Sequence, residues 1–219
     1  MWHPGPRWRK CCGRPLLTGG QADKARPWID HNVALLAPFA AQGIPIVGIE
    51  PSCILTLRDE YPALAADRRR ALLLAQGSFT LEEFIAREHA AGRLAGLRAE
   101  PGSAGKALLH GHCHQKAFGE MQPVLDVLAL LPGVQPTLIE SSCCGMAGSF
   151  GYEVEHVDVS MQMAELSLLP ALRAAPADAI VVADGTSCRH QIADGLQGAR
   201  RARHVADVLA EYLEAASKG

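Results

Sequence analysis

Several features of membrane, secreted and nucleic-acid-binding proteins are missing from this sequence of 219 residues. No apolar run reaches the roughly 20 residues that a membrane-spanning helix requires. The first ten residues lack the apolar stretch of a secretory signal, so we expect a cytoplasmic protein. The formal net charge is only −2. Without a strong positive field, the chain is not expected to bind nucleic acid.

The common catalytic signatures are missing as well. The sequence contains no glycine-rich phosphate loop followed by Lys and Ser or Thr, no dinucleotide fingerprint after a strand, and no nucleophile elbow. Residues 145–151 carry three glycines, but they follow a cysteine pair and their spacing is wrong for a nucleotide-binding turn. We therefore expect neither nicotinamide nor flavin on this chain, and no organic substrate site of its own.

What the sequence does contain is seven cysteines. The odd number and the missing signal argue against a disulfide framework, and clustered cysteines in a reducing compartment more often bind metal or carry redox chemistry. Two clusters are adjacent pairs, Cys11–Cys12 and Cys143–Cys144. Neighbouring cysteines rarely bridge to each other, because the disulfide strains the peptide between them. Metal binding or redox chemistry is therefore the first hypothesis.

The hydrophobic pattern predicts alternating helices and strands. In the N-terminal part, a helix over residues 23–42 would bury Ile29, Val33, Leu36 and Ala40 on one face. It is followed by a buried parallel strand over 44–49 and a helix beginning at Pro51. A helical region over 63–97 is interrupted near Gly77, and residues 99–105 are the best candidate linker.

Beyond this linker, three short strands are predicted at residues 106–110, 137–140 and 179–183. Helices are predicted at 121–131, 157–172 and 203–215, the last with a buried stripe of Val205, Val208, Leu209 and Tyr212. This alternation predicts an α/β fold with a mostly parallel sheet.

The sequence also repeats internally. Cys-Cys-Gly occurs at residues 11–13 and 143–145, and each copy is followed by a helix, a β-branched strand and a Ser-Cys pair ending in Cys53 or Cys188. The second copy has an earlier strand ending near Cys113, which the first lacks. We therefore expect two similar Rossmann-like or flavodoxin-like halves. They would span residues 1–98, truncated at the N-terminus, and 106–219, joined by the linker at 99–105.

Four cysteines follow the ends of the predicted strands in the second half: Cys113, Cys143, Cys144 and Cys188. The carboxyl ends of parallel strands meet at one edge of a sheet, so these thiols should converge. Four thiolates suit either zinc or an iron–sulfur cluster. Structural zinc ligands usually come in pairs two to four residues apart. An adjacent pair with distant partners therefore favours iron–sulfur, with zinc as the alternative.

Other residues near these cysteines are weaker candidates for a part in the site. Gly145 and Gly148 would allow a positive φ, so that backbone amides approach the sulfurs and donate to them; the alternative is a simple turn. His112 and His114 flank Cys113 and are expected to pack or to donate hydrogen bonds rather than to bind metal.

The motifs together resemble a known family, the cysteine-rich "CCG" domain. That domain occurs in heterodisulfide reductase, in its B subunit, and in the iron–sulfur subunit of glycolate oxidase. The sequence looks still more like the C-terminal region of large FAD-linked oxidases, in which a flavin 2-hydroxy-acid dehydrogenase part is fused to an iron–sulfur part. The resemblance rests on residues 11–16, 50–53, 110–116 and 143–151.

The resemblance implies two CCG domains that pass electrons from a flavin or a cubane cluster to an acceptor. Cys113, Cys143, Cys144 and Cys188 match ligand positions of the second domain, and Cys11, Cys12 and Cys53 match the first. It implies a [4Fe–4S]-type cluster, with FAD on a partner or missing domain. The partners would be a flavoprotein dehydrogenase and a ferredoxin-like iron–sulfur domain, and any association with a membrane surface would come through them. Such a module would not be catalytic alone.

Two departures from the family pattern matter. The fullest pattern ends in Cys-x-x-Cys, but Glu50 and Gly185 stand at the first of these positions here. A four-thiolate site is therefore expected instead of a five-cysteine, non-cubane cluster. The first half keeps only three cysteines, so its site is either empty or completed by a partner or by a ligand such as Glu50. The remaining alternatives are a structural zinc protein and a thiol–disulfide protein, which the adjacent pairs disfavour.

Overall fold

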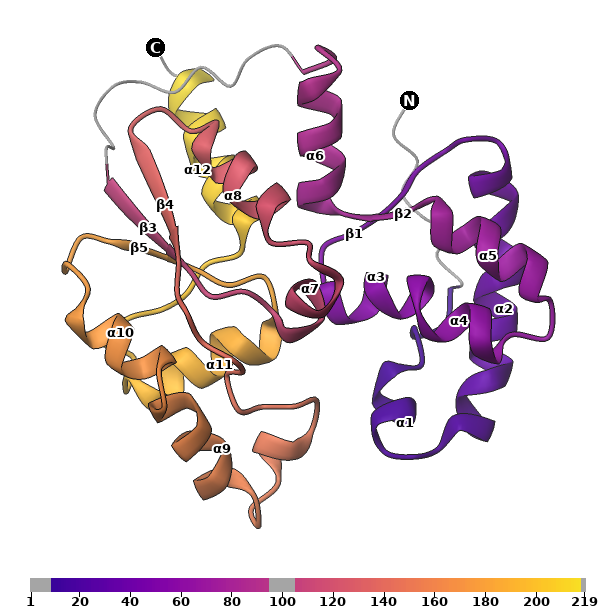
Figure 1. Cartoon of the computed structure of the whole chain (residues 1–219), viewed down its shortest axis with the longest axis horizontal. Coiled ribbons are helices and arrows are strands. Elements are labelled where there is room, and N and C mark those ends of the chain that lie inside the picture. Colours follow the sequence, from indigo (N-terminus) through magenta and orange to yellow (C-terminus); the bar gives the residue numbers. More distant parts are fainter. Residues whose placement is uncertain (1–8, 95–104, 218–219) are drawn as a thin grey trace. The chain divides into compact units, whose positions relative to one another are not determined.

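The computed structural model describes residues 9–94 and 105–217, with side chains up to residue 213 (Figure 1). The chain forms two compact units, Met1–Thr80 and Leu81–Gly219. Within the described residues, no helix combines the length and apolar character needed to cross a membrane. The predicted linker at 99–105 lies outside the described residues except for Gly105. The predicted domain boundaries at 98 and 106 therefore stay a prediction.

The first unit is mainly helical around a small parallel sheet. Its elements are α1 (Arg14–Thr18), α2 (Ala22–Ala41), β1 (Ile46–Gly48), α3 (Pro51–Arg58), α4 (Glu60–Leu64), α5 (Arg68–Gln76) and β2 (Ser78–Thr80). Ile46 of β1 pairs with Ser78 of β2. The predicted first helix is confirmed as α2, and Ile29 and Val33 of its stripe are buried with Leu55, Tyr61 and Leu74.

One prediction for this unit was wrong, and one element was missed. The strand expected to be buried over 44–49 is shorter, Ile46–Gly48, and only partly buried, with Val47 38% exposed and Ile49, just beyond its end, 64% exposed. The physical reason is that β1 belongs to a two-stranded sheet, which has too little packed around it to bury both faces. The predicted break near Gly77 is confirmed, but the strand that follows it, β2, was not predicted, because three residues are too few to show an alternating pattern.

The second unit has a three-stranded parallel sheet in the order β4-β3-β5. This confirms the α/β class with a parallel sheet. Its strands are β3 (Gly105–Leu109), β4 (Val134–Leu138) and β5 (Ile180–Val182). Its helices are α6 (Leu81–Ala90), α7 (Cys113–Phe118), α8 (Gln122–Ala129), the 3-10 turn η1 (Phe150–Tyr152), α9 (Val157–Glu165), α10 (Leu168–Ala174), α11 (Thr186–Gly195) and α12 (Val205–Ser217).

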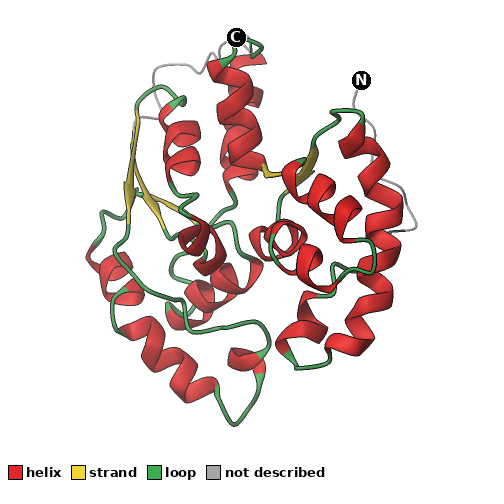
Figure 2. Ribbon diagram, turned by 45° about the vertical axis from the view of Figure 1, so that its right-hand side comes forward, coloured by secondary structure: helices red, strands yellow, loops and turns green. Residues whose placement is uncertain are grey.

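Helices cover both faces of this sheet (Figure 2). Ala107 and Leu109 of β3 pack with α8 and α12, and the predicted stripe on the last helix is buried there. Val181 of β5 belongs to the core that α9, α10 and α11 form on the other face. Side chains that alternate between two cores explain why the strands read as continuous apolar runs.

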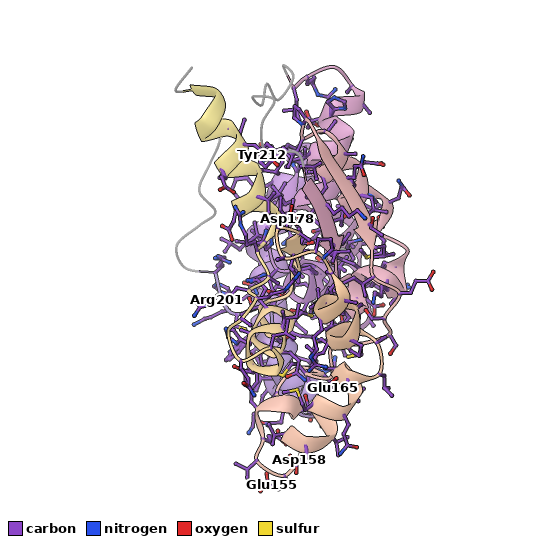
Figure 3. All side chains as sticks on the ribbon, turned by 90° about the vertical axis from the view of Figure 1, so that its left-hand side faces the viewer. Glu155, Asp158, Glu165, Asp178, Arg201 and Tyr212 are labelled. Carbon is purple, nitrogen blue, oxygen red and sulfur yellow. The ribbon has the colours of Figure 1, made fainter. Side chains whose placement is uncertain are left out.

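The helix predicted over 157–172 is in fact two helices, α9 and α10. Pro170 is the third residue of α10 and has no N–H to donate to the carbonyl of Leu166, which favours a break at this point. The turn η1 and the start of α9 form one end of the unit. Figure 3 shows Glu155 and Asp158 at this end, opposite Tyr212 on α12.

Candidate metal centre

In the second unit, each of the three strands leads into a segment that carries cysteine. Cys113 is the first residue of α7, after β3. Cys143 and Cys144 lie in the loop between β4 and η1, and Cys188 is the third residue of α11, after β5. All three segments leave the sheet at the same edge, because the strands are parallel.

The innermost part of this cluster is buried. The side chains of Cys144 and Cys188 are 5% and 2% exposed. Their sulfurs lie within 4.8 Å of each other and of a ring nitrogen of His110. Cys143 is half-buried and Cys113 is exposed, with its sulfur 4.0 Å from Nδ1 of His112. The four thiols therefore run from the core of the unit to its surface.

Backbone amides surround the sulfurs of the adjacent pair. The amide of Gly145 donates to the sulfur of Cys143 at 3.2 Å, and amides at Met146 and Ala147 also face the pair. The backbone reaches this arrangement through positive φ angles at Gly145 (96°), Ala147 (40°) and Gly148 (74°). The predicted positive φ at the two glycines is confirmed. Ala147 lies between them in the left-handed region, which few residues other than glycine adopt.

Burial and most of the bonds among the thiols raise the pKa values of the adjacent pair. A hydrogen bond with Cys144, together with burial, raises the pKa of Cys143. The bond with Cys143 would lower the pKa of Cys144, but the bond with Cys188 and burial outweigh it and raise that pKa to about 12. A cation among the sulfurs would remove this penalty. The site therefore fits a thiophilic metal or an iron–sulfur cluster in the chemistry of its donors.

The histidines expected beside Cys113 have packing and capping roles. His112 is the N-cap of α7: its ring accepts from the amide of His114 at 3.2 Å, and its own amide donates to Oε1 of Gln115 at 3.2 Å. The rings of His112 and His114 lie 5.1 Å apart. These contacts fix the start of α7 and hence the position of Cys113.

Two polar residues of the site were not predicted from the sequence. His110 ends β3, with Nδ1 2.9 Å from Oγ of Ser141, and burial lowers its pKa to about 3, so its ring is neutral. Lys116 of α7 donates to the carbonyl oxygens of Ser141 and Ser142. Both residues lie within three positions of Cys113 in the sequence, and this closeness was the only sequence feature that pointed to them.

In the first unit, the structure brings the three cysteines together, with Cys12 in contact with both Cys53 and Cys11. Cys12 donates to the sulfur of Cys53 at 3.2 Å. This bond raises the pKa of Cys12 and lowers that of Cys53. Cys11 is exposed. The carboxylate of Glu50 accepts from Ser52 at 2.9 Å, and its negative charge opposes ionisation of the nearby Cys53 thiol.

The two units share local features that support the repeat seen in the sequence. Gly13 and Gly145, which follow the cysteine pairs, have φ angles of 88° and 96°. Cys53 and Cys188 are each the third residue of a helix, α3 and α11.

The cysteine turn of the first unit is held by two residues that the sequence did not single out. Asn32 donates to the carbonyl oxygens of Lys10 and Cys11, each at 3.2 Å. Tyr61 accepts from Asn32 at 3.0 Å and donates to the carbonyl of Cys12 at 3.1 Å. This fixed backbone keeps Cys12 directed towards Cys53.

Mild oxidation of the metal-free protein is expected to link Cys12 to Cys53, with loss of two hydrogens. The two sulfurs already touch, and the lowered pKa of Cys53 favours its thiolate as the attacking group. Peptide mapping by mass spectrometry without reduction measures the link. The variant Cys11→Ser should still form the Cys12–Cys53 link. In the wild type, a dominant Cys11–Cys53 link would contradict the geometry.

Comparison with known proteins agrees with this chemistry. The model of a family described as "Cysteine-rich domain" (CCG) matches residues 3–58 and 107–193. The C subunit of anaerobic glycerol-3-phosphate dehydrogenase from Escherichia coli is 31% identical over 206 residues, which are 93% of this chain and 50% of that protein. D-2-hydroxyglutarate dehydrogenase of Escherichia coli is 28% identical over 187 residues, covering 81% of this chain and 17% of that protein.

The D-2-hydroxyglutarate dehydrogenase of Pseudomonas putida is 26% identical over 204 residues, covering 92% of this chain and 18% of that protein. The chain thus spans about half the length of the first of these relatives and less than a fifth of the other two. No solved structure gives a significant match. The family match covers more than half of the sequence, and the chain belongs to the cysteine-rich CCG domain family.

Proposed function

We propose that this chain is the iron–sulfur electron-transfer module of a flavin-linked dehydrogenase, with a 2-hydroxy acid of the lactate or glycolate type as the substrate of the flavoprotein. The cluster would be of the [4Fe–4S] type, held by Cys113, Cys143, Cys144 and Cys188. The flavin would belong to a partner protein or to a further domain. The observation that supports the proposal is the contact among Cys143, Cys144 and Cys188 at one sheet edge, with Cys113 at the start of α7 beside Lys116, which all four thiols influence.

The surroundings of the thiols support an electron carrier. A bound iron–sulfur cluster supplies one-electron chemistry. The protein contributes amide donors, such as that of Gly145 to Cys143, which stabilise extra negative charge on the sulfurs. The buried Cys144 and Cys188 keep water from the inner side of the site. The exposed Cys113 lies on the side from which an electron donor or acceptor would approach.

The relatives support a dehydrogenase partner. One is named as part of a glycerol-3-phosphate dehydrogenase and two are named D-2-hydroxyglutarate dehydrogenase. Oxidation of either named substrate takes two electrons from a carbon bearing a hydroxyl group. D-2-hydroxyglutarate is itself a 2-hydroxy acid, which is why we favour that substrate class. A ferredoxin-like iron–sulfur domain would link the flavin to this module.

For the first unit, we propose an incomplete counterpart of this site at Cys11, Cys12 and Cys53. A metal there would need a further ligand from Glu50 or from a partner chain.

One observation favours a structural zinc site as a second candidate. His110, Cys144 and Cys188 place three ligand atoms within 4.8 Å of one another, a spread that fits a single tetrahedral ion. The neutral ring of His110 could bind it. In this case, the protein would have no redox activity.

Reduction by free flavin separates the two candidates. The anaerobically purified protein is mixed with photoreduced flavin mononucleotide, which stands in for the flavoprotein, and its visible absorption is recorded. The proposed function predicts a broad brown absorption that partly bleaches on reduction and returns on reoxidation. A colourless protein with stoichiometric zinc would support the structural site instead.

A further inference from the structure

Helix α7 connects the three cysteine-bearing segments of the second unit. It begins with Cys113. Two side chains further along the helix, Gln115 and Lys116, reach the other two segments. Gln115 donates to the buried carboxylate of Asp184 at 3.3 Å, which precedes the segment carrying Cys188. Lys116 reaches the segment that carries Cys143.

The contacts of Lys116 are to the backbone just before the cysteine pair. Its ammonium group donates to the carbonyl oxygen of Ser141, to that of Ser142 at 3.3 Å, and to Oγ of Ser141 at 3.4 Å. Ser142 is the residue directly before Cys143. A single half-buried side chain therefore ties α7 to the loop of the adjacent pair.

The position of Lys116 also places a positive charge close to the thiols. Burial lowers the pKa of Lys116, and all four cysteines of the second unit oppose this effect and act to raise it. Another cation close to Cys188, Arg189, instead directs its guanidinium group to the carbonyl oxygens of Ala183 and Asp184, at 2.9 and 2.6 Å.

We propose that Lys116 is a positioning and charge-balancing residue of the four-cysteine site. It holds the Cys143 loop against α7 and places its ammonium group where negative charge accumulates on the sulfurs. The inference rests on the proposed iron–sulfur function. One-electron reduction adds a negative charge to a site that four thiolates already make anionic. A nearby ammonium group stabilises the reduced form more than the oxidised form and so raises the reduction potential.

The test compares reduction potentials of the reconstituted wild type with Lys116→Met and Lys116→Arg. Removing the charge is expected to shift the one-electron equilibrium towards the oxidised form by at least tenfold, or about 59 mV. The arginine variant, which keeps a charge and donors, should stay close to wild type. Lys106→Met is the matched control, because Lys106 is exposed near the start of β3, at the opposite end of this strand from the cysteines.

The outcomes are distinguishable. Equal potentials in wild type and Lys116→Met, with equal iron content, would overturn the inference and leave the proposed function intact. An equal shift in Lys106→Met would also overturn it, since the effect would then be one of net charge. Iron lost from Lys116→Met but kept in Lys116→Arg would support the inference. Iron lost from both folded variants would overturn it, because the arginine keeps the positive charge. A wild type without iron would overturn the proposed function together with this inference.

Discussion

Replacement of both Cys144 and Cys188 by serine is expected to abolish iron binding by the second unit. These are the two buried thiols of the site, and a serine hydroxyl is a much poorer ligand for iron in a cluster than a thiolate. Reconstituted wild type should hold about four irons per chain if the cluster is of the [4Fe–4S] type, and the double variant close to none. Iron and acid-labile sulfide assays on purified protein measure both.

The matched control for this experiment lies in the other unit. The variant with Cys12 and Cys53 replaced by serine removes two partly buried cysteines that also contact each other. It should keep the iron of the second unit. A buried hydroxyl group without a partner costs about 1–3 kcal/mol, so each variant must be shown to be folded. Circular dichroism measures this. Iron retained by a folded Cys144/Cys188 variant would contradict the assigned ligands.

Replacement of Gly145 by alanine is expected to damage both the fold and the site. At a φ of 96°, a Cβ would collide with the carbonyl oxygen of Ser160 and lie 2.9 Å from its carbonyl carbon. The Ser160 backbone cannot easily move, because it belongs to α9 and its carbonyl accepts from the buried Gln191 at 3.0 Å. We expect a loss of about 2–5 kcal/mol of unfolding free energy, from steric overlap and backbone strain together.

A second glycine separates these two costs. Gly198 also has a positive φ, 74°, but a Cβ there would meet nothing within 4 Å. Gly198→Ala should therefore cost only about 1–2 kcal/mol, the penalty of the left-handed conformation alone. Chemical denaturation of the metal-free variants measures both losses. Equal destabilisation by the two substitutions would show that contact with Ser160 does not explain the conformation of Gly145.

The sequence predicted the parts of the fold that depend on local periodicity. The stripe on α12 and strands β3 and β5 could be identified because apolar residues recur at helical or strand spacing, whereas β4 begins three residues before the predicted 137–140. The rule for parallel strand ends predicted that the segments carrying Cys113, the adjacent pair and Cys188 leave the sheet at one edge, as they do. The short elements were missed: β2 has three residues, and α7 and α11 begin at polar segments without an apolar repeat.

The contacts of the site could not be predicted in the same way. Lys116 and Ser141 are 25 positions apart, and Asn32 and Tyr61 are 29 positions apart. No spacing rule pairs such side chains, because their meeting depends on how the helices pack. In the sequence, His110 is an ordinary residue at the end of a strand. Its burial and its contact with Ser141 depend on the tertiary fold.

The metal content and electron paramagnetic resonance spectrum of protein purified without oxygen decide whether the second unit holds an iron–sulfur cluster. We expect about four irons with matching sulfide per chain, and a paramagnetic signal in one redox state that is lost when Cys144 and Cys188 become serine. One zinc ion with no iron or sulfide, bound through the same cysteines, would contradict the account and leave a structural metal site in its place.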